Sequence, residues 1–91
     1  MARITSAQLE AFLAFGNASI AVCEVKELAR RCQPGDAAED LLAELRDAHE
    51  HLRELFDQGL DDAVCVLARD VMELASKSTA VLNQEQQRSG S

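Results

Sequence analysis

Residues that break helices are so few in this sequence that they divide it into three long, uninterrupted segments. The only proline, Pro34, is followed by Gly35, and the next glycine is Gly59. Proline disfavours a helical conformation in the residue before it, and glycine allows the left-handed turn that ends many helices. No segment alternates apolar and polar residues for long enough to form a half-buried strand. The sequence therefore predicts an all-α chain with helices at about residues 6–32, 36–58 and 61–84.

The starts of these helices also carry local signals. Thr5 and Gln8 have the spacing of a capping box, in which each side chain binds a backbone amide of the other residue. Asp36 and Glu39 repeat that spacing at the second helix. The two aspartates at 61–62 favour a third start, both by capping and by their charge near the positive end of the helix dipole.

Apolar spacing in the second and third segments predicts how the helices pack. In both segments apolar residues recur at alternating steps of three and four, which is typical of a helix that buries one face in a bundle. The positions in the second segment are Ala38, Leu41, Leu45, Ala48, Leu52 and Leu55. Short connections make neighbouring helices antiparallel. We expect a single helical domain over residues 1–85, either a three-helix antiparallel bundle or an extended helical hairpin, and a flexible C-terminal tail over 86–91.

The first segment is apolar on nearly every side. Its polar positions Glu10, Asn17, Glu24 and Arg31 lie seven apart and therefore form one narrow column. Two neighbouring helices would cover about half of such a helix, so we expect a second interface on it, either with another copy or with a partner protein. The alternative is that its alanines, which are small and favour helices, lie exposed without a partner. The candidate interface residues are Phe12, Leu13, Ala14, Phe15, Ile20, Ala21 and Val22.

Acidic charge is concentrated in the middle segment. The chain has 16 acidic and 9 basic residues, and residues 33–60 alone contain eight acidic and two basic residues. Asp40, Asp47 and Glu54 lie seven apart and form an acidic face opposite the apolar stripe. Such a face could capture a basic partner, or it could simply be a solvated surface that keeps the protein soluble. Arg46 and Glu50 are four apart, which favours an ion pair along the helix.

Composition excludes several kinds of partner. A net charge of −7 disfavours binding to the phosphate backbone of nucleic acids and to anionic membranes. No stretch approaches the roughly 20 apolar residues of a membrane span. Residues 11–25 are too interrupted by polar side chains to form a secretory signal. Three cysteines without a close pair are typical of a reducing compartment, so we expect a cytoplasmic location.

Catalytic, metal and cofactor signatures are missing. His49 and His51 are two apart, which places them on opposite sides of a helix, and the cysteines do not have the spacing of zinc ligands. The segment 57–63 resembles the modification segment of acyl carrier proteins. Asp62, however, stands where those proteins carry the serine that holds phosphopantetheine. We therefore expect no enzyme activity, no metal and no cofactor.

These patterns favour a non-enzymatic helical interaction module, a homo-oligomer or a protein that binds a partner through its first helix. Size and charge are similar to those of small acidic chaperones of bacterial secretion systems, which is one alternative. A regulator that captures a basic partner through its acidic helix face is another.

Overall fold

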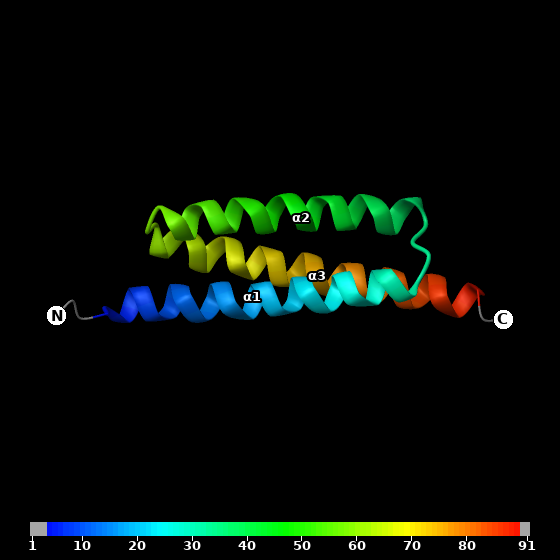
Figure 1. Cartoon of the computed structure of the whole chain (residues 1–91), viewed down its shortest axis with the longest axis horizontal. Coiled ribbons are helices and arrows are strands. Elements are labelled where there is room, and N and C mark those ends of the chain that lie inside the picture. Colours follow the sequence, from blue (N-terminus) through cyan, green and yellow to red (C-terminus); the bar gives the residue numbers. More distant parts are fainter. Residues whose placement is uncertain (1–3, 90–91) are drawn as a thin grey trace.

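The computed structural model describes residues 4–89 and shows a bundle of three long helices. Within that range the helices are α1 (Ser6–Arg31), α2 (Asp36–Asp57) and α3 (Asp61–Ser89), and no residue is in a strand. The chain reverses direction at each connection, so α2 is antiparallel to both neighbours while α1 and α3 run parallel (Figure 1). The predicted all-α, three-helix bundle is therefore confirmed.

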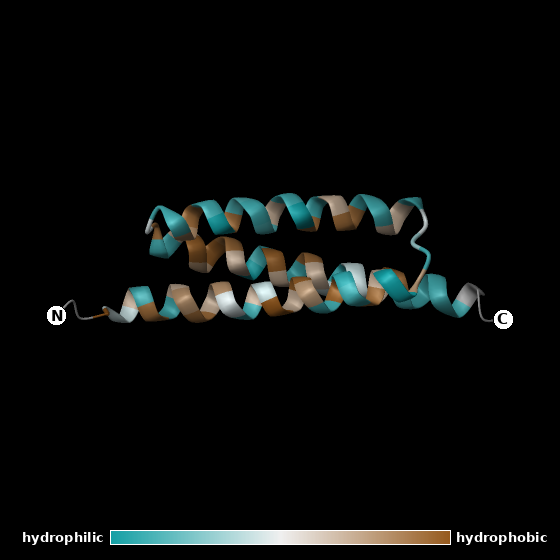
Figure 2. Ribbon diagram, in the orientation of Figure 1, coloured by the Kyte–Doolittle hydropathy of each residue, from teal (hydrophilic) through white to brown (hydrophobic). Residues whose placement is uncertain are grey.

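The bundle is a long, thin rod. It measures 58 × 16 × 16 Å and has a radius of gyration of 15.1 Å, against about 12 Å for a compact domain of this length. α3 packs extensively against both other helices, whereas α1 and α2 contact each other less. Every helix therefore keeps a long side facing outward, and Figure 2 shows that α2 is mostly hydrophilic along its ribbon.

The core is a single line of small and aliphatic side chains along the axis of the rod. Its buried apolar members are Ala11, Ala18, Val22, Val25, Ala38, Leu45, Leu52, Val64, Ala68, Val71, Ala75 and Leu82. Ser78 is also buried, and its hydroxyl donates to the carbonyl oxygen of Leu74 at 2.8 Å. Because α1 and α3 both contribute alanines to this core, their backbones can approach closely.

The turn between α2 and α3 confirms the role predicted for Gly59. This glycine has a φ of +75°, and its amide donates to the carbonyl of Phe56 at 3.1 Å. The next amide, that of Leu60, donates to the carbonyl of Leu55 at 3.1 Å. This pair of hydrogen bonds is the Schellman motif, which needs a left-handed residue at the position of Gly59.

The starts of α1 and α2 are built differently. At α1 the predicted capping box is present: the amide of Gln8 donates to Thr5 Oγ1 at 3.1 Å, and the amide of Thr5 donates to Gln8 Oε1 at 2.9 Å. At α2 the capping box predicted for Asp36 and Glu39 is absent, because the capping position is Gly35 and Asp36 is the first helical residue. The amide of Gly35 instead donates to Glu85 Oε2 on α3 at 2.7 Å.

The third helix is longer than predicted, since it ends at Ser89 rather than near Gln84. Its final turns extend beyond the end of α1, alongside the loop that joins α1 to α2 (Figure 1). There Glu85 binds Gly35, and the thiol of Cys32 lies 3.6 Å from Gln86 Oε1. Residues 86–89 of the predicted tail thus continue α3, and residues 90–91 lie outside the described range.

Candidate functional site

One side of α1 carries a line of uncharged residues, of which all but the partly buried Gly16 are exposed. Leu9, Leu13, Gly16, Ile20 and Cys23 follow one another at alternating steps of four and three, which places them on one line along the helix. At about 100° per residue this line lies opposite the buried face of the same helix. Leu9, Leu13 and Ile20 are 50%, 54% and 59% exposed. We call these five residues the outer stripe.

The structure separates the seven predicted interface residues into three groups: exposed, partly buried and buried. Leu13 and Ile20 belong to the outer stripe, and Phe12, which is also exposed, lies beside it. Val22 is in the core, on the side of α1 that faces away from the outer stripe. The remaining three are partly buried and pack against that core; they are Ala14, Phe15 and Ala21. Leu9, Gly16 and Cys23 were not among the predicted residues, although their steps of three or four from Leu13 and Ile20 place them on the same line.

Aromatic rings join α1 to α2 near the first half of α1. The rings of Phe15 and Phe56 are stacked with centroids 4.6 Å apart. The ring of Phe12 lies 6.3 Å from that of Phe56, and the His49 imidazole stacks on Phe15 at 6.2 Å. Phe15 therefore holds the two helices together, while Phe12 only touches this cluster with one side and leaves the other to solvent.

His49 is half-buried in the same contact. Its Nε2 lies 3.0 Å from the hydroxyl of Ser19 on α1. Burial lowers the pKa of His49 below its usual 6.5, and the positive charges of Lys26 and Arg53 lower it further. The imidazole is thus a hydrogen-bonded, stacked part of the contact between α1 and α2.

The acidic face lies on the outward side of α2. Asp40, Asp47 and Glu54 are all exposed there, as predicted from their spacing, and they point away from the buried Leu45 and Leu52. Glu54 Oε2 is 3.9 Å from Nδ1 of the exposed His51. The surface is therefore open to solvent, and its aspartates make no ion pair with another described residue.

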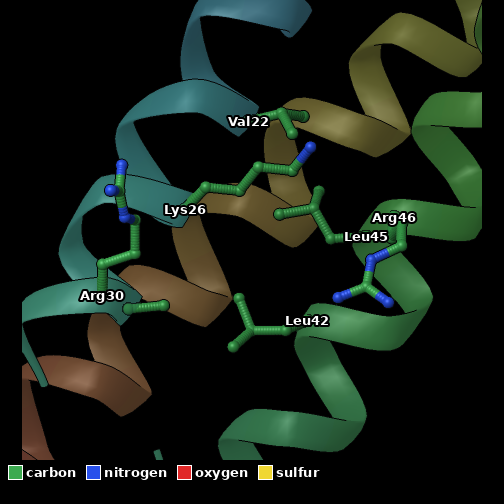
Figure 3. A pocket seen from close by; sticks show the side chains of 7 residues that line it. Val22, Lys26, Arg30, Leu42, Leu45 and Arg46 are labelled. Atoms are coloured by element: carbon green, nitrogen blue, oxygen red, sulfur yellow. The ribbon is translucent and has the colours of Figure 1, made fainter. Parts of the chain in front are cut away.

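A groove between α1 and α2 begins where the aromatic contact ends. It has a volume of about 410 Å³. Its lining residues are Val22, Lys26, Ala29 and Arg30 of α1 and Leu42, Leu45 and Arg46 of α2. The ion pair predicted between Arg46 and Glu50 is absent among the described residues, and Arg46 lines the groove instead (Figure 3).

Groupings that could hold a metal are absent from residues 4–89, because no three histidine, cysteine or acidic side chains converge there. Cys23, Cys32 and Cys65 are free thiols, of which Cys23 is the most exposed. Across the described part of the chain, none of the helices has the length and apolar content of a membrane span.

Comparison with family models, with curated proteins and with solved structures gives no match for this chain.

Proposed function

We propose that this protein is a non-enzymatic helical interaction module that self-associates through the outer stripe of α1. The observation that carries the proposal is the exposure of Leu9, Leu13 and Ile20 on one line, opposite the face that α1 buries in its own core. Exposed apolar residues scattered singly are ordinary, but a continuous stripe with the spacing of a helical interface indicates a docking surface.

Charge favours a second copy of the chain as the occupant. Two molecules with a net charge of −7 repel each other most strongly if their acidic α2 helices meet. Residues 9–23 contain a single charged side chain, Glu10. Contact through this part of α1 therefore brings together surfaces that hardly repel, and it leaves the acidic face pointing outward into solvent.

The length of the outer stripe indicates how strong the association should be. Leu9 and Cys23 are 14 residues apart, or about 21 Å along the helix. One face of a helix is about 10 Å wide, so a stripe of this length covers only about 200 Å². That area is well below the roughly 800 Å² per partner of a standard stable interface. We therefore expect a reversible dimer with a dissociation constant of about 10 µM to 1 mM.

The test is light scattering coupled to size-exclusion chromatography over a series of protein concentrations. The wild type should shift from monomer to dimer, whereas Leu13→Glu/Ile20→Glu should remain a monomer. The matched control is Val66→Glu/Met72→Glu, which replaces two exposed apolar residues of α3 and adds the same charge. A wild type that stays monomeric at every concentration contradicts the proposal, and so does a control that loses association equally.

The acidic face supports a second candidate, a regulator that captures a basic partner. Asp40 and Asp47 are exposed and make no ion pair with a described residue. Binding of a lysine-rich peptide should weaken strongly as salt rises, and Asp40→Asn/Asp47→Asn should weaken it further. Binding that is insensitive to both changes contradicts this candidate.

A further inference from the structure

The groove between α1 and α2 combines an apolar floor with positively charged sides. Val22 and Leu45 are 1% exposed and form its base, and Ala29 and Leu42 pack against the same core. Its volume of about 410 Å³ lies within the range of roughly 300–1,000 Å³ that is usual for small-molecule sites. An apolar ligand group lying on this floor would be removed from water.

Two cations reach this groove from opposite helices. Figure 3 shows Lys26 extended from α1 across the groove toward α2, and the guanidinium of Arg46 lying beside Leu42. Neither forms an ion pair with any residue of the described chain. Arg30 differs, because its guanidinium donates to Glu27 Oε2 at 3.3 Å and is turned along α1.

Lys26 and Arg46 are exposed, unpaired cations on the two sides of one groove. With 16 acidic side chains available, Lys26 and Arg46 still have no carboxylate within ion-pair distance in residues 4–89. The charge of Lys26 is also felt by His49, whose pKa it lowers in addition to the larger effect of burial. Both Lys26 and Arg46 are exposed, so their charged groups are accessible to an anionic group of a ligand.

We propose that this groove binds an amphipathic carboxylate of the fatty-acid class. The hydrocarbon chain lies on the floor formed by Val22, Leu42 and Leu45, and the carboxylate lies between Lys26 and Arg46. An inorganic anion would contact only the two cations, and a neutral hydrocarbon would contact only the apolar floor. The site is independent of self-association, because none of its lining residues belongs to the outer stripe.

The test is isothermal titration calorimetry of the full chain with decanoate as the probe. We expect saturable binding of one decanoate per chain. Hexanoate, which has four fewer methylene groups, should bind at least about tenfold more weakly, because each buried methylene contributes about 0.8 kcal/mol. Decanol should also bind at least about tenfold more weakly, because it lacks the charge that the two cations recognise.

Variants locate the site. Lys26→Gln/Arg46→Gln should weaken decanoate binding at least about tenfold. The matched control Arg69→Gln/Lys77→Gln removes one arginine and one lysine from the exposed surface of α3 and should leave binding unchanged. Circular dichroism of each variant verifies that the helices remain folded.

The proposal is overturned by no saturable decanoate binding, by equal binding to the Lys26→Gln/Arg46→Gln variant, or by equal binding of decanol. The variant Leu13→Glu/Ile20→Glu, which should be monomeric, should bind decanoate as the wild type does. Loss of binding there would assign the ligand to the outer stripe instead and would also contradict this site. Failure of the groove proposal and failure of self-association are thus separate outcomes.

Discussion

Ala11 and Ala18 are wholly buried on α1, while the larger Leu13 and Ile20 are more than half exposed on the same helix. The sequence predicted a second interface on this helix because it is apolar on nearly every side. It could not show which side the bundle would take, since both sides satisfy the helical period. α1 buries its small side chains against α3, because they let the two backbones approach closely. The larger residues are left outside.

Gly59 and Gly16 should respond in opposite ways to the same substitution. Gly59→Ala should destabilise the protein by about 1 kcal/mol, because an L-residue with a Cβ is strained at a φ of +75°. Gly16 lies within α1 with nothing within 4 Å of an added Cβ. Gly16→Ala should therefore stabilise by about 0.5–1 kcal/mol. Urea unfolding of both variants checks this pair, and a loss of stability in Gly16→Ala would contradict it.

His49 should make stability depend on pH. Because burial, and then Lys26 and Arg53, lower its pKa below 6.5, the unfolded chain takes up a proton before the folded chain does as pH falls. The free energy of unfolding should therefore fall as pH drops below about 6.5, and it should level off once the folded His49 is also protonated. In the folded protein the imidazole of His49 is hydrogen-bonded with the hydroxyl of Ser19 and stacked on the ring of Phe15.

The measurement is urea unfolding between about pH 7.5 and 5.5. His49→Gln should lose less stability over this interval than the wild type. His51→Gln, which changes the exposed neighbouring histidine, should keep the wild-type loss. Identical losses in all three proteins would show that His49 does not contribute.

Among the elements, α2 and α3 were the more predictable. Their apolar residues form one stripe each, and Leu45, Leu52, Val64 and Val71 are all buried as that spacing predicts. The hydrogen bond just before α2 was not predictable, because it comes from a side chain distant in sequence: Glu85 accepts from the amide of Gly35, 50 positions away. The groove escaped prediction for the same reason. From the spacing along α2 we predicted an ion pair between Arg46 and Glu50. In the folded bundle Arg46 instead lines the groove between α2 and α1.

A buried leucine and an exposed leucine should contribute very differently to the free energy of unfolding. Leu52 of α2 is 0% exposed, so Leu52→Ala leaves a cavity in a core only one layer thick and should cost about 2–5 kcal/mol. Leu13→Ala changes an exposed side chain and should alter the stability of the monomer by no more than about 0.5 kcal/mol. Chemical denaturation at a concentration below the dimer range measures both. Equal effects would mean that the outer stripe is covered within the monomer.

The whole molecule is a rod whose sides differ in charge and polarity. The outer stripe of α1 is nearly uncharged, whereas the outward side of α2 is acidic and the groove between these helices is lined by cations. A short chain with a thin core can offer three such surfaces because its elongated shape leaves a side of every helix exposed. Each surface fits a partner of different chemistry, and the salt dependence of binding distinguishes an apolar contact from a charged one.

Self-association through the outer stripe should become stronger as salt rises. Each copy carries a net charge of −7, so two copies repel, and added salt screens that repulsion without weakening apolar contacts. Between about 50 mM and 500 mM NaCl, over which the screening length falls several-fold, the dimer dissociation constant should decrease about three- to tenfold. Sedimentation equilibrium at both salt concentrations measures it. Leu13→Glu/Ile20→Glu should remain monomeric throughout, which separates the stripe from non-specific association at high salt. A dimer that weakens with salt would instead be held by ion pairs, such as contacts between the acidic face of one copy and the cations of another.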